Sequence, residues 1–227
     1  MALLSSPRVS LFTPTKNNID SLLEVEKLAW GNMGGENTEA SREKILLRVE
    51  SFSQGVTLAT VEGKAAGSQY AFLFSWDGNI NELKSWDEHT CYGWTNKIHT
   101  PNGNTGFMVG VGVVPEFRSV LFEHNLRWHK PLKISQLLIA RTLDNLFAQG
   151  AKTIIANARI PDYHTKSELS VKEYCALKRE DGLLYDRVLR FHKSMGAETI
   201  KPVAFSMEDP ESLNGGCWVV YNKPFAV

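Results

Sequence analysis

The strongest constraint on the fold is one apolar run near the middle of the chain, FMVGVGVVPEFRS, which covers residues 107–119. Its β-branched residues predict a buried strand from Gly106 to Val114 that ends at a proline, an acid and an arginine. Such a strand end is typical of a site beside a phosphate, where glycines let several backbone N–H groups turn onto one anion. Here the chain continues as VLFEHNLRWHKPLKISQLL, without a glycine. Residues 116–133 are therefore predicted to form an atypical phosphate loop.

The segments on either side of this strand alternate between helix and strand patterns, which predicts an α/β layered fold. The expected helices are 17–30, 38–52, 134–150, 170–181 and 182–197, and the expected strands are 8–14, 56–63, 64–77, 106–114, 151–161, 197–206 and 217–225. No repeat or low-complexity linker interrupts them, so residues 1–227 are predicted to form a single domain. Residues 78–104 are expected to be an insertion or a lid.

Composition narrows the class of protein. The 25 Lys and Arg residues balance the 25 Asp and Glu residues, so no overall basic field is present to attract nucleic acid. The three cysteines are far apart and show no CxxC spacing, which predicts neither disulfides nor a zinc site and fits a reducing cytoplasm. The six histidines also lack the spacing of metal ligands, so no metal is expected.

The beginning of the chain lacks the charge and apolar length of a secretion signal. No run approaches the roughly 18 apolar residues that span a bilayer. The sequence therefore predicts a cytoplasmic protein that binds no membrane.

The order of elements resembles the GCN5-related N-acetyltransferase (GNAT) superfamily. VGVVPEFR is similar to the central strand of that family with its V-x-P-x-x-R ending, ISQLLIARTLDNLFAQGAKTI to the following helix and strand, and LRFHKSMGA to a late family signature. The resemblance implies a mixed, mostly antiparallel sheet flanked by helices, with a splayed central strand. It also implies that the arm of coenzyme A or phosphopantetheine, as the carrier of an acyl thioester, lies along Gly110, Val111, Gly112, Val113 and Val114.

The same resemblance implies where the phosphate of the coenzyme A or phosphopantetheine arm binds. Aligned on SQLL, the R-x-x-G-x-G spacing of the family falls on Arg127, Lys130 and Leu132, so bulky residues occupy both glycine positions. The missing glycines argue against a tight cradle for the pyrophosphate of free coenzyme A, and suit the single phosphodiester of a carrier-bound arm. The alternative is an ordinary solvated basic loop. The expected phosphate-binding residues are Arg118, Arg127, Lys130, Lys133, Ser135 and Gln136.

Two departures from an amine acetyltransferase concern the catalytic positions. Residues 106–114 contain no acid that could serve as a general base for an ammonium, and His192 stands where the family places a tyrosine. A second resemblance fits these departures, to the GNAT-like domains of polyketide synthase loading modules of the curacin type. It rests on the long segment before SQLL, on IIANARIPDYH and on LKREDG before LYDRVLRFH. It implies decarboxylation of a malonyl or methylmalonyl thioester on an acyl carrier protein, in the loading step of polyketide synthesis, and it leaves open whether S-acyl transfer follows.

That reaction leaves an enolate, which needs hydrogen-bond donors and a source of a proton. The resemblance implies His164 as the catalytic histidine, and Arg179 is expected to pair with the malonyl carboxylate. His192 is a further candidate, and Trp30 is expected to wall the substrate pocket. Each has a plainer interpretation: a loop histidine bonded to Asp162, a solvated arginine, a packed histidine and a core tryptophan.

Two other functions stay open. One is transfer of acetyl from acetyl-CoA to an amine, and the other is a non-catalytic GNAT-like domain that contacts neighbouring synthase modules. The hydroxyl partner of the histidine has no clear counterpart between Asn125 and Ser135.

Overall fold

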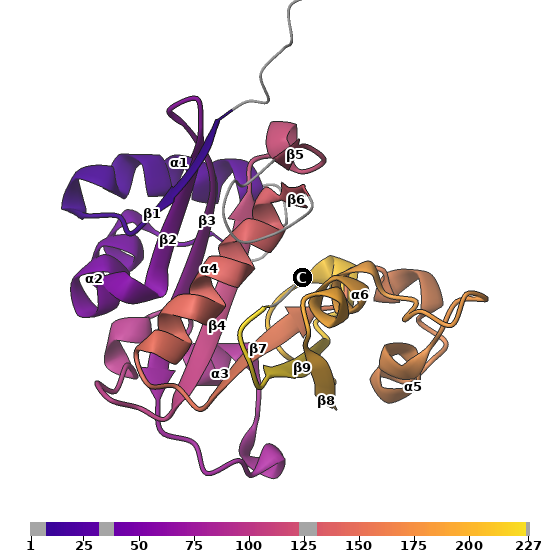
Figure 1. Cartoon of the computed structure of the whole chain (residues 1–227). Helices are drawn as coiled ribbons and strands as arrows, with labels where there is room; N and C mark the ends of the chain where they lie inside the picture. The colour runs from indigo at the N-terminus through magenta and orange to yellow at the C-terminus, as the bar shows by residue number, and fades with distance from the viewer. Residues whose placement is uncertain (1–7, 32–38, 123–130, 226–227) are drawn as a thin grey trace, which may run out of the picture.

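A computed structural model describes residues 8–31, 39–122 and 131–225 of the chain. Its centre is a seven-stranded sheet of strand order β1-β2-β3-β4-β7-β9-β8 (Figure 1). Neighbouring strands are antiparallel except β4 and β7, which are parallel. The strands are β1 (Val9–Phe12), β2 (Val56–Val61), β3 (Lys64–Phe74), β4 (Thr105–Val113), β7 (Thr153–Arg159), β8 (Glu198–Val203) and β9 (Gly216–Tyr221). The predicted mixed, mostly antiparallel sheet is confirmed.

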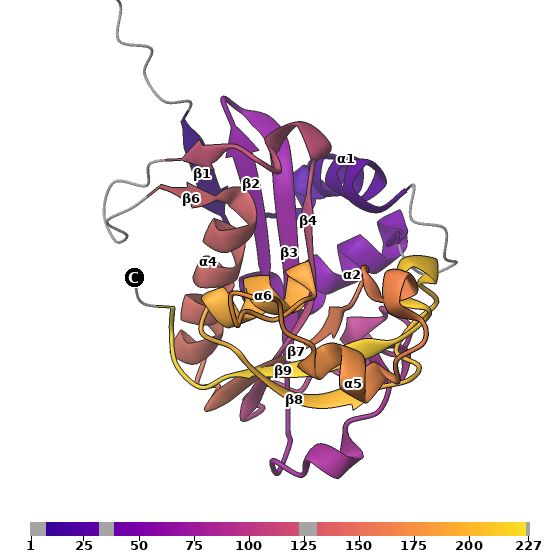
Figure 2. The same ribbon diagram turned by 90° about the vertical axis from the view of Figure 1, so that its right-hand side faces the viewer.

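Helices cover both faces of the sheet (Figure 2). α1 (Ile19–Trp30), α2 (Arg42–Phe52) and the short α3 (Trp86–Thr90) pack on one face, where their apolar residues form a core cluster with β2, β3 and β4. α4 (Ile134–Ala148) and α6 (Arg187–Ser194) pack on the other face around a second cluster. We call these the α1 face and the α4 face. Among the described residues, no helix is long and apolar enough to span a membrane.

Residues 78–104, expected to be an insertion or a lid, are packed against the α1 face. Leu83 and Thr90 are fully buried, and the Trp218 indole donates to the Lys84 carbonyl at 2.8 Å. The Lys201 ammonium donates to the carbonyls of Asn81 and Leu83. These contacts make the segment part of the core on this face.

The structure corrects the predicted helix at 170–181. α5 (Val171–Ala176) is shorter, and residues 177–185 form a turn in which Arg179 N–H donates to the Leu183 carbonyl at 2.8 Å. Gly182, at φ +77°, supplies the left-handed residue of this turn. The next helix, α6, begins only at Arg187, because the Asp186 carboxylate caps the N–H groups of Val188 and Leu189.

Candidate functional site

The parallel strands at the centre of the sheet separate part-way along their length. β4 and β7 pair at four positions, from Thr105 with Thr153 to Met108 with Ala156. Beyond this point β4 stays paired with β3 as far as Val113, and β7 stays paired with β9 as far as Arg159. The facing edges of 109–113 and 157–159 are therefore open. We call this region the splay.

A β-bulge lies where the splay begins. Tyr70 pairs with Gly110 and Ala71 with Met108, so Val109 is an extra residue in β4. The Trp86 indole donates to the Val109 carbonyl at 2.9 Å, which satisfies the group that the bulge leaves out of the ladder. A bulge bends its strand, and this one bends β4 at the residue where pairing with β7 stops.

The direction of the backbone groups decides which of them face the splay. Val114 N–H donates to the Ala66 carbonyl of the β3 side. Because alternate residues of a strand direct their N–H and C=O groups to opposite edges, the groups of Val111 and Val113 face the splay. Those of Gly110, Gly112 and Val114 face β3. Of the five residues expected to contact a pantetheine arm, two therefore present hydrogen-bonding groups to it.

The glycines of β4 make room for Trp30. A Cβ atom at Gly112 would lie 2.9 Å from Trp30 Nε1 and 3.2 Å from the Ala29 Cβ. A Cβ atom at Gly110 would have its nearest neighbour, Trp30 Cζ2, at 4.0 Å. The half-buried Trp30 ring therefore lies over Gly112 and leaves space above Gly110 on the α1 face.

Buried polar side chains surround this space. Tyr70 and Ser68 lie on β3 opposite Gly110 and Gly112, and both hydroxyl oxygens are buried. The Arg48 guanidinium lies 4.8 Å from the centre of the Tyr70 ring and donates to the Gly93 carbonyl. Burial raises the pKa of the Glu26 carboxyl, although the Arg48 charge and the Ala40 N–H oppose that rise.

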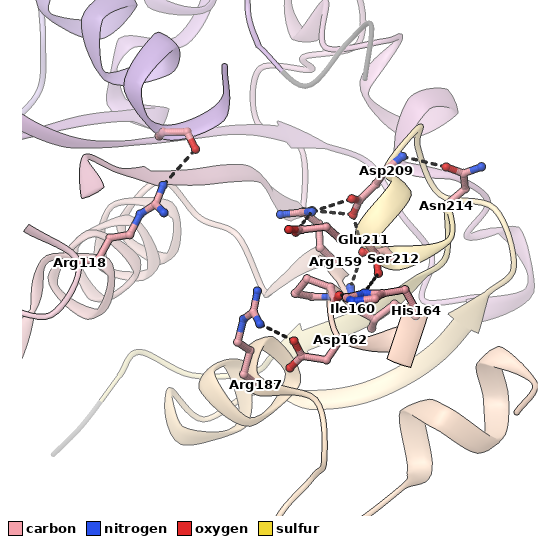
Figure 3. Close-up of polar contacts among 12 residues, drawn as sticks. Arg118, Arg159, Ile160, Asp162, His164, Arg187, Asp209, Glu211, Ser212 and Asn214 are labelled. Carbon is pink, nitrogen blue, oxygen red and sulfur yellow. Dashed lines mark hydrogen bonds and ion pairs between the residues drawn. The ribbon is translucent and has the colours of Figure 1, made fainter. Parts of the chain in front are cut away.

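The phosphate end of the site follows β4. Arg118 donates from Nε to the Val113 carbonyl at 3.0 Å and from Nη2 to the Ala29 carbonyl at 3.2 Å, so it fastens the end of β4 to the end of α1 (Figure 3). The predicted loop 116–133 contains two short strands, β5 (Leu121–Phe122) and β6 (Leu132–Lys133), which pair with each other.

α4 begins directly after β6. Lys133 is exposed, Ser135 and Gln136 are half-buried in the first turn of α4, and the Gln136 side chain accepts from Lys133 N–H at 3.0 Å. Two further residues predicted to bind phosphate, Arg127 and Lys130, lie outside the described residues.

A charged network closes the other side of the splay, at the end of β7. Arg159 donates to both oxygens of Asp209 at 2.6 Å and to Glu211 at 3.0 Å (Figure 3). Burial alone would raise the pKa of Asp209, but hydrogen bonds from Arg159 and Ser212 and the guanidinium charge lower it. Ser212 also accepts from Ile160 N–H at 3.1 Å. The loop between β8 and β9 is thereby fixed to the end of β7.

His164 lies in the turn that follows β7. Its Nδ1 is 2.8 Å from the Pro161 carbonyl and 3.0 Å from the Glu211 carbonyl. Because both partners are acceptors, Nδ1 carries a proton, and Nε2 is the nitrogen left to exchange one. Asp162 is paired with Arg187 instead of with this histidine (Figure 3). The side chain is exposed, and Figure 3 shows Arg159 and Arg187 between it and Arg118.

The other two predicted catalytic residues lie elsewhere. Arg179 is exposed in the turn after α5, where it pairs with Asp181 at 3.1 Å beside a surface hollow of about 700 Å³. Figure 1 shows α5 at the side of the molecule away from α1 and α2. His192 is buried on the α4 face, with Nδ1 2.6 Å from the Tyr221 hydroxyl. Burial lowers the pKa of His192 to about 4, so it is neutral at physiological pH.

One polar residue of the splay was missed from the sequence. Asn157 is the first residue of β7 beyond its pairing with β4. The available signal was an amide in the otherwise apolar strand IIANARIP. No group of three or more metal-binding side chains occurs in residues 8–31, 39–122 and 131–225.

The comparisons with known proteins agree on the fold. No protein-family model matches the chain. The uncharacterized N-acetyltransferase YkwB of Bacillus subtilis (strain 168) is 24% identical over 212 residues, which cover 93% of this chain and 87% of that protein.

Two solved structures are similar over most of their length. The loading GNATL domain of CurA from Lyngbya majuscula has a TM-score of 0.76 at 23% identity, with 95% of this chain and 98% of that chain covered. The GphF GNAT-like decarboxylase, solved with isobutyryl-CoA, has a TM-score of 0.71 at 21% identity with the same coverage. The chain has the GNAT fold, and the predicted resemblance to GNAT-like loading and decarboxylase domains is confirmed.

Proposed function

We propose that this chain binds an acyl thioester of phosphopantetheine or coenzyme A in the splay and removes CO2 from a malonyl or methylmalonyl group. One observation carries the proposal: the splay presents backbone N–H groups, while residues 109–113 and 157–159 contain no Asp or Glu. Acetylation of an ammonium needs a base at the reacting centre, whereas decarboxylation needs donors for a developing enolate. The structural similarity to GphF, a GNAT-like decarboxylase solved with an acyl-CoA, supports the same chemistry.

The pantetheine arm would lie along the open edge of β4. The N–H and C=O groups of Val111 and the N–H of Val113 would hydrogen-bond it as an added strand does. The Val113 carbonyl would stay with Arg118 and the Val109 carbonyl with Trp86. The phosphate would lie at the start of α4, where Ser135 is in the first turn and the helix dipole favours an anion. Lys133, Arg118 and, beyond the described residues, Arg127 and Lys130 would add positive charge.

The acyl group would turn onto the α1 face, into the space above Gly110. Trp30 forms one wall of that space, and an apolar wall favours loss of a carboxylate as neutral CO2. His164, as an imidazolium with a proton on each nitrogen, would give its Nε2 proton to the enolate carbon and become the neutral ring whose Nδ1–H is held by two carbonyls. We assign no step to Arg179 or His192, because the first is paired with Asp181 at the surface and the second is enclosed in the core.

The partner that we propose is an acyl carrier protein, which presents its substrate on a phosphopantetheine arm, in the loading step of a polyketide synthase. The cytoplasm is the compartment that we propose for this reaction. Both remain expectations drawn from the family resemblance.

The proposal is tested by mass spectrometry of malonyl- and methylmalonyl-carrier protein, and of the corresponding CoA thioesters, after incubation with the protein. The expected result is loss of CO2 with the acyl group still on the arm. His164→Ala should abolish that loss, and so should His164→Asn, whose amide can keep the bonds to Pro161 and Glu211 but cannot transfer a proton. Activity retained in His164→Asn would show that the histidine only supports the turn. Intact substrate with the unaltered protein would overturn the decarboxylase.

A second candidate is transfer of acetyl from acetyl-CoA to an amine. The description of YkwB as an N-acetyltransferase favours it, and Glu26, whose pKa burial raises, is a carboxyl near the α1 face of β4. It predicts free thiol from acetyl-CoA only when an amine is present, and loss of that activity in Glu26→Gln. If neither assay gives a product, the remaining possibility is a non-catalytic domain.

A further inference from the structure

Asn157 is a half-buried residue at the splay whose side-chain amide nitrogen is buried. Side chains alternate along β7, and Ile155 belongs to the core cluster of the α1 face, so Asn157 lies on that face too. Its Nδ2 is buried and, among the residues that the structure describes, has no hydrogen-bond partner. A buried donor left unpaired is unfavourable, so such a group calls for an explanation.

The other end of this amide is fixed. Ser206 Oγ donates to Asn157 Oδ1 at 2.7 Å. Ser206 is itself held by its backbone, because its N–H donates to the Asn214 carbonyl at 2.7 Å and its carbonyl accepts from Asp87 N–H at 3.2 Å. Gly216 permits this arrangement, since a Cβ there would lie 2.4 Å from Asn157 Oδ1 and 2.8 Å from Ser206 Cβ.

These contacts give the amide a direction. Oδ1 is turned toward Ser206 and Gly216, on the β9 side of the strand, and the two ends of a planar amide diverge. Nδ2 is therefore turned away from β9, in the part of β7 where the neighbour on the opposite side is the open edge of β4. The hydrogen bond from Ser206 thus orients the Asn157 amide before a substrate binds.

We propose that Asn157 is a catalytic residue whose Nδ2 donates to the carbonyl oxygen of the bound thioester, with Ser206 as its positioning residue. The inference rests on the proposed acyl-thioester function. When the bond between the carboxylate carbon and Cα breaks, its electron pair forms a C=C bond and the carbonyl π pair moves to oxygen, releasing CO2. The thioester enolate then takes one proton at Cα, so that a malonyl thioester and H⁺ become an acetyl thioester and CO2. Asn157 would stabilise the oxygen on which the negative charge appears.

The test compares Asn157→Asp with Asn157→Ala and Ser206→Ala. Aspartate is isosteric and still accepts from Ser206, but it turns an oxygen toward the substrate carbonyl in place of a donor. Loss of one oxyanion donor typically lowers kcat by about 10²–10³-fold, so both Asn157 variants should lose about that factor in kcat with a smaller change in KM. Ser206→Ala should lose less, because the donor remains but is no longer fixed, and Ser206→Thr should restore kcat. Equal kcat in all variants would refute the inference. Full activity in Asn157→Asp would also refute it, because catalysis would then need no hydrogen-bond donor at this position.

A binding measurement separates this inference from the proposed reaction. Acetyl-CoA contains the thioester carbonyl and S-ethyl-CoA lacks it, so calorimetry with both reports contact with that oxygen. The unaltered protein should prefer acetyl-CoA, and Asn157→Asp should lose the preference while retaining its affinity for S-ethyl-CoA. If the protein fails to decarboxylate but shows this pattern, the reaction is wrong and the Asn157 contact stands. If decarboxylation occurs and the pattern is absent, only the Asn157 inference fails. Urea unfolding of each variant identifies any loss that comes from folding.

Discussion

Two glycines in one strand should respond in opposite ways to the addition of a methyl group. In Gly112→Ala the new Cβ would lie 2.9 Å from Trp30 Nε1 and 3.2 Å from Ala29 Cβ, both tighter than ordinary contact. In Gly110→Ala it would meet only Trp30 Cζ2, at 4.0 Å. Neither glycine has a positive φ, so alanine is compatible with the backbone at both positions.

These contacts set the expected difference in unfolding free energy between the two variants. Overpacking a core position costs about 1–3 kcal/mol, while Gly→Ala at a compatible position stabilises by about 0.4–1 kcal/mol through the unfolded chain. The chain-entropy contribution is common to both variants, so the difference in unfolding free energy between them is the overpacking cost alone. Gly110→Ala should therefore be as stable as the unaltered protein or slightly more stable, and Gly112→Ala should be less stable by about 1–3 kcal/mol than Gly110→Ala.

Urea and thermal unfolding measure this difference, which for a chain of this size is about 2–4 °C in Tm for each kcal/mol. Gly110→Ala should impair activity although it leaves the fold intact. Its methyl group would occupy the proposed acyl space, so KM for malonyl thioesters should rise. Equal stability of the two variants would refute the position of Trp30 over Gly112. An unchanged KM in Gly110→Ala would refute the use of the space above Gly110.

Three further predictions concern groups around the site. His192 is neutral in the folded protein because burial lowers its pKa to about 4. Since the unfolded chain binds the proton below about pH 6.5, the unfolding free energy should fall by about 3 kcal/mol between pH 6.5 and 4. The fall should be smaller in His192→Gln. Trp86→Phe removes the donor to Val109 at the bulge and should lower the unfolding free energy by about 1–3 kcal/mol. Asp209→Asn breaks a pair whose carboxylate is 1% exposed and should cost about 3 kcal/mol. Urea unfolding measures all three.

Matched variants control these measurements. Trp94→Phe makes the same change in an indole that lies near two lysine ammonium groups, and it should have the smaller effect. Glu211→Gln alters the half-exposed partner of Arg159 and should cost less than about 1 kcal/mol. Equal losses in a variant and its control would contradict the bond in question, and a pH profile unchanged in His192→Gln would contradict the burial argument.

Local patterns predicted most of the elements around the site. The strand expected at 106–114 is Thr105–Val113 and the helix expected at 134–150 is Ile134–Ala148. The strand is nearly all apolar, the helix carries apolar residues at helical spacing, and turn residues bound both, so the local pattern and the tertiary structure agree. The helix expected at 170–181 ends at Ala176, because contacts with residues beyond it compete with the helix propensity of 177–181. Tyr174 donates to the buried Asp186 at 3.0 Å, which ties the two ends of the turn together.

The detailed geometry of the site depends on contacts between residues far apart in the chain. The bulge at Val109 uses the indole of Trp86, from a segment expected to be an insertion or a lid. Asn157 is oriented by Ser206, and Arg159 by Asp209, both from the loop between β8 and β9. The periodicity of a sequence does not predict contacts between distant residues. The open strand edge could therefore be predicted only from family resemblance, and the side chains that face it could not be predicted.

The phosphate site that we propose lies beside a loop after β4 that contains no glycine. Phe122 and Leu132 pair across β5 and β6, and both are fully buried in the core of the α4 face. They fix where the loop leaves and rejoins the core, so the start of α4 is positioned by apolar packing and needs no backbone cradle around an anion. The N–H groups of one helix start can meet a single phosphate, whereas a pyrophosphate needs the further N–H groups that a glycine loop would provide. The proposed site therefore suits the single phosphodiester of a carrier-bound arm better than the pyrophosphate of free coenzyme A.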